Sequence, residues 1–409
     1  SAWDVRTYTY PRLAGLRVGA DGYDDRWANT NLYGPWMAGF RPEDRPYPGW
    51  GALGWVDLYD EDNGIGFAVR DVLESETSFE LRRDASAGND ACRLEAVKKH
   101  GIASGEERTW RYTMLLHPGR WHATADMYGR WFRDKFGVAD HFPDWARDSN
   151  GWVNTNACLQ RNMQWEKLLD SFESGRQFGV DWVQVWGQFG SSSCSSFWWP
   201  SPAYGSIDEF ARVNREIRNR GGHIGYYLMY DRENRYNLID EKTYEGYLPQ
   251  DRYPDGVPML SVEEFVKGMR VTDPEGKLTG WPQTDEAMAE FRGKLAGLHA
   301  EDKKTIWAPG SMWKLNPRDD DWREHLVTWT CDLYVDRWNC DTAYQDVLGC
   351  GHAGRSFDLR RGDHGHIYGG ANMEIARLLT EEGVKRDPAF ALSAEGKSEL
   401  VTRWAMGMT

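Results

Sequence analysis

Apolar and polar residues alternate with a period of two along several runs in the first part of the chain. Two such runs within 54–70 flank an Asp-Asn-Gly turn, which is a strong signal of a β-hairpin. Three further alternating runs are Thr77–Arg82, Cys92–Val97 and Trp110–Leu116. A helix at 121–133 follows them. We therefore predict an antiparallel β-sandwich over residues 1–140, which the chain enters partway.

From Gly151 onward, short apolar segments alternate with amphipathic ones. The short segments, which predict strands, are 152–156, 182–187, 223–230, 342–345 and 389–393. The amphipathic segments, which predict helices, are 164–177, 207–218, 321–330 and 373–380. Repeated strand–helix units are typical of a parallel sheet covered by helices. The fold class expected for 141–409 is therefore α/β, a (β/α)8 TIM-type barrel.

This barrel is expected to be incomplete. Five strand units are recognisable instead of eight, and a long insertion at 231–319 separates the third from the fourth. Five parallel strands alone would expose a sheet edge and half of a core. Strands hidden in the insertion or a homo-oligomer would cover it, but we favour a chain that is a piece of a longer protein.

The amino-acid composition indicates which kinds of molecule the protein is expected to bind. Lys and Arg number 49 and Asp and Glu 63, a net charge of −14, which disfavours binding to nucleic acid or to an anionic membrane. No apolar run approaches the roughly 18–20 residues of a membrane helix. The six cysteines form no CxxC pair, so no zinc site and no cofactor are expected, and free buried thiols are the simplest reading for most of them. The 22 Trp residues indicate an aromatic core, a surface of flat rings, or both.

The start of the chain bears on its location. Residues 1–6 lack the basic and apolar regions of a signal peptide, although the chain does not begin with Met. We expect a secreted or periplasmic protein rather than a cytoplasmic one.

Chemistry in barrels collects at the carboxyl ends of the strands. The residues at the ends of the predicted strands are Asn154 and Asn156, Trp186 and Gln188, Asp231, Asp346, and Glu395. Asp346 and Glu395 end adjacent strands, which lie about 4.8 Å apart. Two carboxyl groups about 5–5.5 Å apart are the equipment of a retaining glycoside hydrolase. The simpler alternatives are a helix cap or turn for Asp346 and a solvated loop residue for Glu395.

Other polar and aromatic residues are candidates for substrate binding. Asp231, Asn154, Asn156 and Gln188 offer hydrogen bonds, with an ion pair to a nearby arginine as the alternative for Asp231. His364 and His366 stand in a glycine-rich turn that could aim an imidazole at a sugar hydroxyl or, with Asp231, hold a metal ion. Rings expected at the barrel mouth are Trp186, Phe197, Trp198, Trp199, Trp307 and Trp313. Trp182, Trp322 and Trp329 are expected in the core.

Several short motifs resemble a bacterial group of glycoside-hydrolase-like barrel proteins, many of them known only as a domain of unknown function. They are Tyr-Gln-Asp-Val-Leu-Gly-Cys at 344–350, Phe-Asp at 357–358, His-Gly-His-Ile-Tyr-Gly-Gly at 364–370, Leu-Ser-Ala-Glu-Gly at 392–396, two runs at 55–60 and 64–71, and Tyr-Gly-Arg-Trp at 128–131. The resemblance implies a β-sandwich followed by a (β/α)8 barrel. Related barrels such as the α-amylase-like clan carry an Asp nucleophile on the fourth strand and a Glu acid/base on the fifth. By that likeness Asp346 is the nucleophile and Glu395 the acid/base.

The sequence thus predicts a glycosidase that cleaves an oligo- or polysaccharide by a retaining mechanism. A non-catalytic carbohydrate-binding barrel is the first alternative, because aromatic rings with Asn and Gln side chains suffice for binding. A metal-dependent hydrolase that uses Asp231, His364 and His366 is the second.

Overall fold

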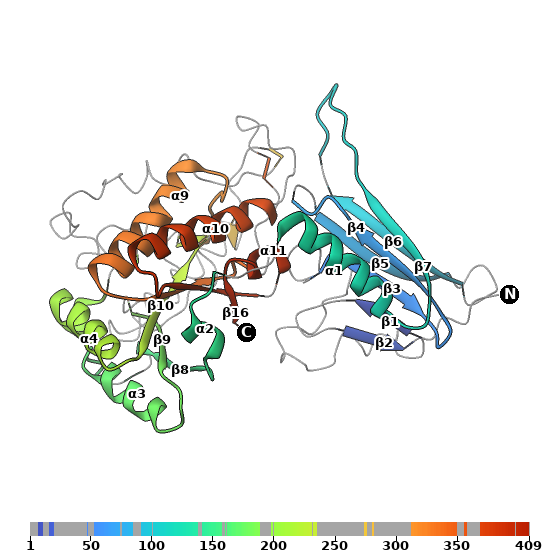
Figure 1. Cartoon of the computed structure of the whole chain (residues 1–409). Coiled ribbons are helices and arrows are strands. Elements are labelled where there is room, and N and C mark those ends of the chain that lie inside the picture. Colours follow the sequence, from blue (N-terminus) through green and yellow to red (C-terminus); the bar gives the residue numbers. More distant parts are fainter. Residues whose placement is uncertain are drawn as a thin grey trace, which may run out of the picture.

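The computed structural model describes residues 7–10, 16–19, 47, 53–73, 76–84, 91–99, 101–137, 141–157, 160, 162–188, 198, 200–230, 232–234, 274–275, 280–281, 312–349, 356–357, 369–396 and 398–408. Two groups of elements lie side by side in Figure 1. Strands β1 to β7 and helix α1 form the first, which we call the antiparallel unit. Strands β8 to β16 and their helices form the second, the parallel unit.

The antiparallel unit contains two described sheets. Five strands follow the order β2-β1-β3-β4-β7, and β5 pairs with β6. Their bounds are β1 Thr7–Tyr10, β2 Leu16–Gly19, β3 Trp55–Tyr59, β4 Asn63–Val69, β5 Glu76–Asp84, β6 Ala91–Lys99 and β7 Tyr112–Pro118. The antiparallel strands are as expected, and their closure into a sandwich stays a prediction.

The predicted hairpin is strands β3 and β4. They pair from Trp55 opposite Ala68 to Tyr59 opposite Gly64. The turn comes earlier than the Asp-Asn-Gly signal indicated, because Oδ1 of Asp60 accepts hydrogen bonds from the backbone N–H groups of Asp62 and Asn63. This side chain closes the turn, and Asn63 already belongs to β4.

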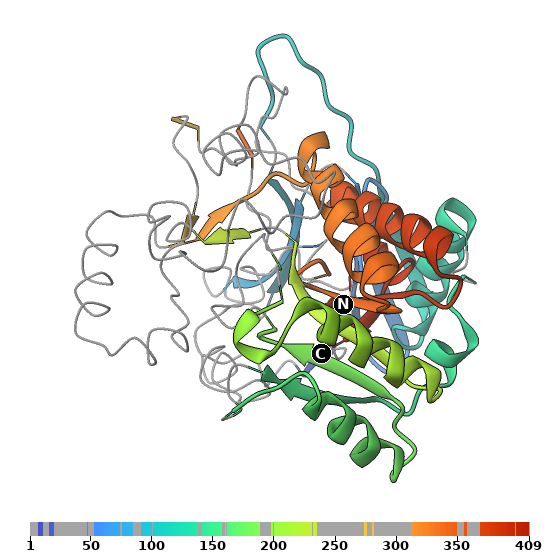
Figure 2. The same ribbon diagram turned by 90° about the vertical axis from the view of Figure 1, so that its left-hand side faces the viewer.

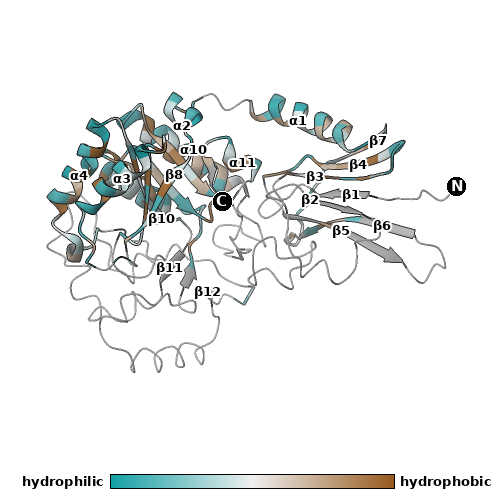
Figure 3. Ribbon diagram, turned by 90° about the horizontal axis from the view of Figure 1, so that it is seen from below, coloured by the Kyte–Doolittle hydropathy of each residue, from teal (hydrophilic) through white to brown (hydrophobic). Residues whose placement is uncertain are grey.

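Helix α1 (His122–Phe136) packs on one face of the five-stranded sheet, opposite β5 and β6 (Figure 3). Close packing depends on Gly66, where a Cβ would lie 1.9 Å from Oγ1 of Thr124 on the helix. Thr124 in turn donates to the buried carboxyl of Asp57, which also bonds to Nε2 of His117 at 2.9 Å. This polar contact fixes the helix on the sheet.

Six parallel strands make up the main sheet of the parallel unit, in the order β16-β15-β14-β10-β9-β8. They are β8 Trp152–Asn156, β9 Trp182–Trp186, β10 His223–Met229, β14 Thr342–Asp346, β15 Ala391–Glu395 and β16 Met406–Met408. Each strand neighbours the next one of this sheet along the chain, which is the winding of a barrel rather than of a doubly wound sheet. Closure into eight units stays a prediction.

Strand β16 corrects the prediction that five strands are visible. Met406 pairs with Ser393 and Met408 with Glu395. Three residues are too few to show a period, so the sequence carried no signal for this strand.

Helices cover one face of the parallel sheet (Figure 2). They are α3 Lys167–Arg176, α4 Ile207–Asn219, α9 Asp320–Val327, the π-helix η9 Thr328–Arg337 and α10 Gly369–Arg386. Two short helices, α2 Asp144–Asp148 and α11 Glu399–Thr402, lie nearer the antiparallel unit (Figure 1). Asp319 caps α9 by accepting from the backbone N–H of Trp322. The predicted insertion holds β11 Arg232–Asn234, β12 Gly280–Trp281 and β13 Met312–Lys314, which form a small antiparallel sheet.

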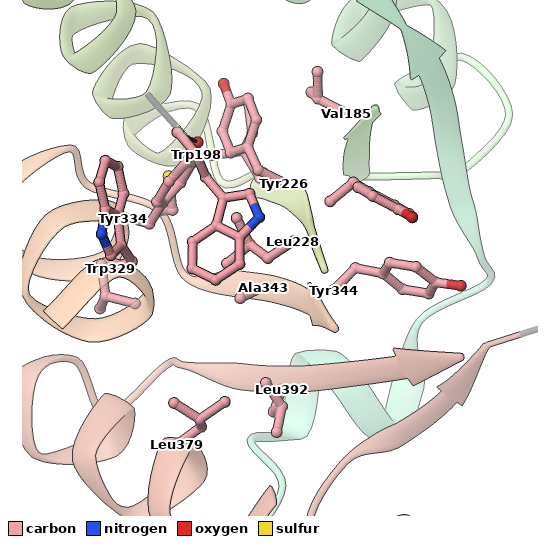
Figure 4. Close-up of a cluster of buried hydrophobic side chains, with 14 of the residues drawn as sticks. Val185, Trp198, Tyr226, Leu228, Trp329, Tyr334, Ala343, Tyr344, Leu379 and Leu392 are labelled. Atoms are coloured by element: carbon pink, nitrogen blue, oxygen red, sulfur yellow. Dashed lines mark hydrogen bonds between the residues drawn. The ribbon is translucent and has the colours of Figure 1, made fainter. Parts of the chain in front are cut away.

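The main core lies between this sheet and its helices, and it is rich in indoles (Figure 4). Fully buried tryptophans are Trp165, Trp198, Trp322, Trp329 and Trp338. Trp182, Trp322 and Trp329 were expected here. Trp198 was expected at the barrel mouth and is a correction, because it packs against Trp322 and Trp329 with centroids 6.3 and 6.0 Å away. Cys331 and Cys340 are buried free thiols, as expected.

A buried carboxyl joins the two units. Glu399, the first residue of α11, is 9% exposed, and its Oε1 accepts from the hydroxyls of Tyr47 and Tyr128 and from the backbone N–H of Gly54. Next to it, Leu400 is buried in the core of the antiparallel unit. Desolvation raises the pKa of Glu399 from its ordinary 4.5 to about 7, although these hydrogen bonds oppose the rise.

The raised pKa of Glu399 predicts that stability falls with rising pH. Between about pH 4.5 and 7 the folded state keeps a proton that the unfolded chain has lost, so the free energy of unfolding decreases through this window. The variant Glu399→Gln removes this contribution to the pH dependence of the free energy of unfolding, as measured by urea unfolding followed by Trp fluorescence. The matched control, Glu324→Gln on the exposed face of α9, keeps it. An unchanged slope in Glu399→Gln contradicts the assignment.

Candidate functional site

The carboxyl ends of β14 and β15 bring two acidic side chains together. The parallel register pairs Tyr344 with Ser393 and Gln345 with Ala394, so Asp346 and Glu395 end their strands at the same level. Side chains alternate along a strand, and the two residues therefore share the face of Tyr344 and Ser393. Gln345 points the other way, since its amide donates to Oγ1 of Thr330 on η9.

Glu395 is bonded to the residue that follows Asp346. The backbone N–H of Val347 donates to Oε2 of Glu395 at 3.2 Å. Val347 has a φ of 55°, a region that strains a β-branched residue by about 1–3 kcal/mol. This strained residue turns its N–H toward the glutamate carboxyl, so the two strand ends are held together at the position where their acidic side chains lie.

The loops after the two strands are packed backbone against backbone. The N–H of Gly349 donates to the carbonyl of Glu395 at 2.7 Å, and the N–H of Ser398 donates to the carbonyl of Gly349 at 3.2 Å. A Cβ on Gly349 would lie 2.6 Å from the carbonyl oxygen of Glu395. Only glycine fits at this contact.

Tyr227 on β10 completes the site. Its hydroxyl donates a hydrogen bond to Oδ2 of Asp346, which is 9% exposed. Tyr227 is not among the residues predicted from the sequence, because it does not stand at a strand end. Tyr227 lies two residues before the end of β10 and is paired with Tyr344 on β14, so the two side chains share a face of the sheet.

Aromatic rings line the sheet beside these groups. Trp186, at the end of β9, lies 4.5 Å from Tyr227 and 5.2 Å from Tyr344 between ring centroids. The Nε1 of Trp186 is buried without a hydrogen-bond partner among the described residues. The expected ring at this edge is therefore present, with a polar atom left for another partner.

The remaining predicted residues differ in position. Asn156 shares the level of Trp186, and Asn154 is exposed on the same face of β8. Gln188 is fully buried, and its amide donates to the carbonyl of Tyr227 at 2.6 Å, which supports the strand carrying that tyrosine. Sugar contacts by these three side chains stay predictions.

Some predictions cannot be placed. Asp231, His364, His366, Trp199, Phe197 and Trp307 lie outside the described residues, and Trp313 is described only as part of β13. Among the residues that the structure does describe, no group of three or more His, Cys, Asp and Glu side chains could hold a metal ion. Within the same part of the chain, no helix is long and apolar enough to cross a bilayer.

Comparison with known proteins shows a shared fold. No protein-family model and no curated protein matches the chain. Among solved structures, the α-N-acetylgalactosaminidase NagBb from Bifidobacterium bifidum matches with a TM-score of 0.61 and 10% identity, covering 98% of this chain and 60% of that one. The α-galactosidase TtGalA from Thermus thermophilus matches with a TM-score of 0.54 and 11% identity, over 99% and 65% of the two chains.

A cycloalternan-degrading enzyme from Trueperella pyogenes is more distant, with a TM-score of 0.50, 14% identity, and 87% and 45% coverage. The chain therefore has a glycoside-hydrolase-like fold and spans about 60% of the length of NagBb.

Proposed function

We propose that this protein is a retaining glycoside hydrolase in which Asp346 is the nucleophile and Glu395 the general acid/base. One observation carries the proposal: β14 and β15 end in register, and each ends on a residue with a carboxyl group. The two strand ends are linked by the 3.2 Å hydrogen bond from the backbone N–H of Val347 to Glu395. Adjacent strands lie about 4.8 Å apart, which suits the roughly 5–5.5 Å between the carboxyls of a retaining pair.

The chemistry requires two steps. An oxygen of Asp346 attacks the anomeric carbon while protonated Glu395 gives its proton to the departing glycosidic oxygen, so the glycosidic bond breaks and an ester to Asp346 forms. Glu395, now ionised, then takes a proton from water, whose oxygen attacks the same carbon and releases Asp346. Both groups return to their starting protonation states.

Two contacts support these roles. The hydroxyl of Tyr227 donates to Oδ2 of Asp346, which orients the carboxylate. Trp186, which is partly exposed at the end of β9, offers a flat apolar ring next to Tyr344, and such a ring stacks on the apolar face of a sugar.

The structural neighbours direct the choice of substrate. NagBb is described as an α-N-acetylgalactosaminidase and TtGalA as an α-galactosidase. We therefore take α-linked galactosides and N-acetylgalactosaminides as the first substrates to test, within a wider class of α-linked oligosaccharides.

Replacing either carboxyl is expected to lower turnover sharply, to a degree that depends on the leaving group for Glu395. For the intact protein on an aryl α-glycoside, Asp346→Asn lowers kcat/KM by at least about 10³-fold, because no nucleophile remains. Glu395→Gln has a comparable effect on substrates whose leaving group needs a proton. Its effect is much smaller on dinitrophenyl glycosides, because dinitrophenolate departs without being protonated. Initial rates of phenol release measure both.

The exposed-site controls Asp134→Asn and Glu324→Gln keep full activity. Unchanged turnover in both active-site variants contradicts the proposal. Sugar binding by the parent protein without any cleavage would instead identify a non-catalytic carbohydrate-binding protein.

Tyr227→Phe tests the support of the nucleophile. A hydrogen bond to a charged group is worth about 1.5–3 kcal/mol, so its loss lowers kcat by roughly 10–100-fold. KM changes little because the ring and its contact with Trp186 remain. Steady-state kinetics with the same aryl glycoside give both constants. The control Tyr226→Phe removes a hydroxyl from the helix side of the same strand, where it donates to Asn214, and it retains activity. An equal loss in both variants contradicts a specific role.

A further inference from the structure

The loop after β15 carries two acidic residues with different surroundings. Glu395 ends the strand at the site, and Glu399 begins α11 four positions later in the chain. Between them Gly396 has a φ of 90°, a backbone conformation that favours glycine. One short loop thus links the proposed acid/base to the contact between the two units.

Glu399 is fixed from the antiparallel unit by residues far apart in the sequence. Tyr47 precedes β3 and Tyr128 belongs to α1, yet both hydroxyls donate to Oε1 of Glu399. Helices α1 and α11 lie next to each other in Figure 1. The N–H of Gly54 adds a third bond, at 3.3 Å. Three donors converging on one oxygen specify the position of the start of α11 more narrowly than the apolar burial of Leu400 does.

The loop transmits this position to the site through the backbone. Ser398, which precedes Glu399, donates to the carbonyl of Gly349, and Gly349 donates to the carbonyl of Glu395. Gly349 is packed directly against the backbone of Glu395. A shift of Ser398 therefore displaces Gly349, Glu395 or both. Gly349 itself follows Asp346 by three residues.

We infer that Glu399 is a positioning residue through which the antiparallel unit holds Glu395 in place for proton transfer. This inference rests on the proposed role of Glu395 as acid/base. The antiparallel unit then takes part in catalysis although none of its described residues belongs to the site.

The test compares leaving groups in the intact protein. Glu399→Ala removes the oxygen that the three donors share, and a misplacement of about 1 Å in a catalytic group can cost about 10²-fold. We expect kcat/KM on alkyl glycosides to fall at least about 10-fold more than on dinitrophenyl glycosides, whose departure needs no proton. Glu399→Gln keeps an accepting oxygen and restores most of the activity. If Glu399→Ala fails to fold, Tyr128→Phe removes one donor and shows the same selectivity to a smaller degree.

Val56→Ala is the matched control, because it weakens the same core of the antiparallel unit but removes none of the hydrogen bonds to Glu399. It is expected to lower both activities equally or not at all. An equal loss on both leaving groups in Glu399→Ala and Tyr128→Phe overturns the inference. If Glu395→Gln itself shows no dependence on the leaving group, the proposed function is at fault instead.

Discussion

The parallel pairing of β14 with β15 is the constraint on which the rest of the site depends. Because Gln345 lies opposite Ala394, the acidic residue that ends each strand comes to the same edge and the same face. A slip of one residue in either strand would turn its carboxyl toward the helices. The register is secured on the helix side by buried Ala343 and Leu392 (Figure 4). At the edge it is secured by the bond between the backbone N–H of Val347 and the carboxyl of Glu395.

The two faces of the sheet divide the aromatic residues of this unusually Trp-rich chain. Rings on the helix side, such as Trp329 and Tyr334, are buried in a core that makes the sheet rigid. Rings on the opposite face, Trp186, Tyr227 and Tyr344, lie next to the acidic pair. Position along the chain does not separate the two groups, but the side of the strand does. A rigid core behind the strands is what allows the acidic side chains in front of them to be held in position.

Much of the fold was predictable because its signals are local. The β3–β4 hairpin, the strand at 152–156 and helix α4 follow from residues close together in sequence. The π-helix η9, the strand β16 and the burial of Trp198 depend on distant partners, and no local period reports them. Asp346 and Glu395 could be predicted as a candidate pair because strand ends in parallel sheets are known places for chemistry. Tyr227 and Glu399 could not be predicted, because their hydrogen bonds cross strands and units that are far apart in sequence.

The identity of the nucleophile is the central claim, and a trapped intermediate tests it most directly. The intact protein is incubated with a 5-fluoroglycosyl fluoride of the sugar that it turns over, and the labelled peptide is then sequenced by mass spectrometry. The account predicts one glycosyl group attached to Asp346 and a product of retained configuration. A label on another residue, or an inverted product formed without any covalent intermediate, would contradict it.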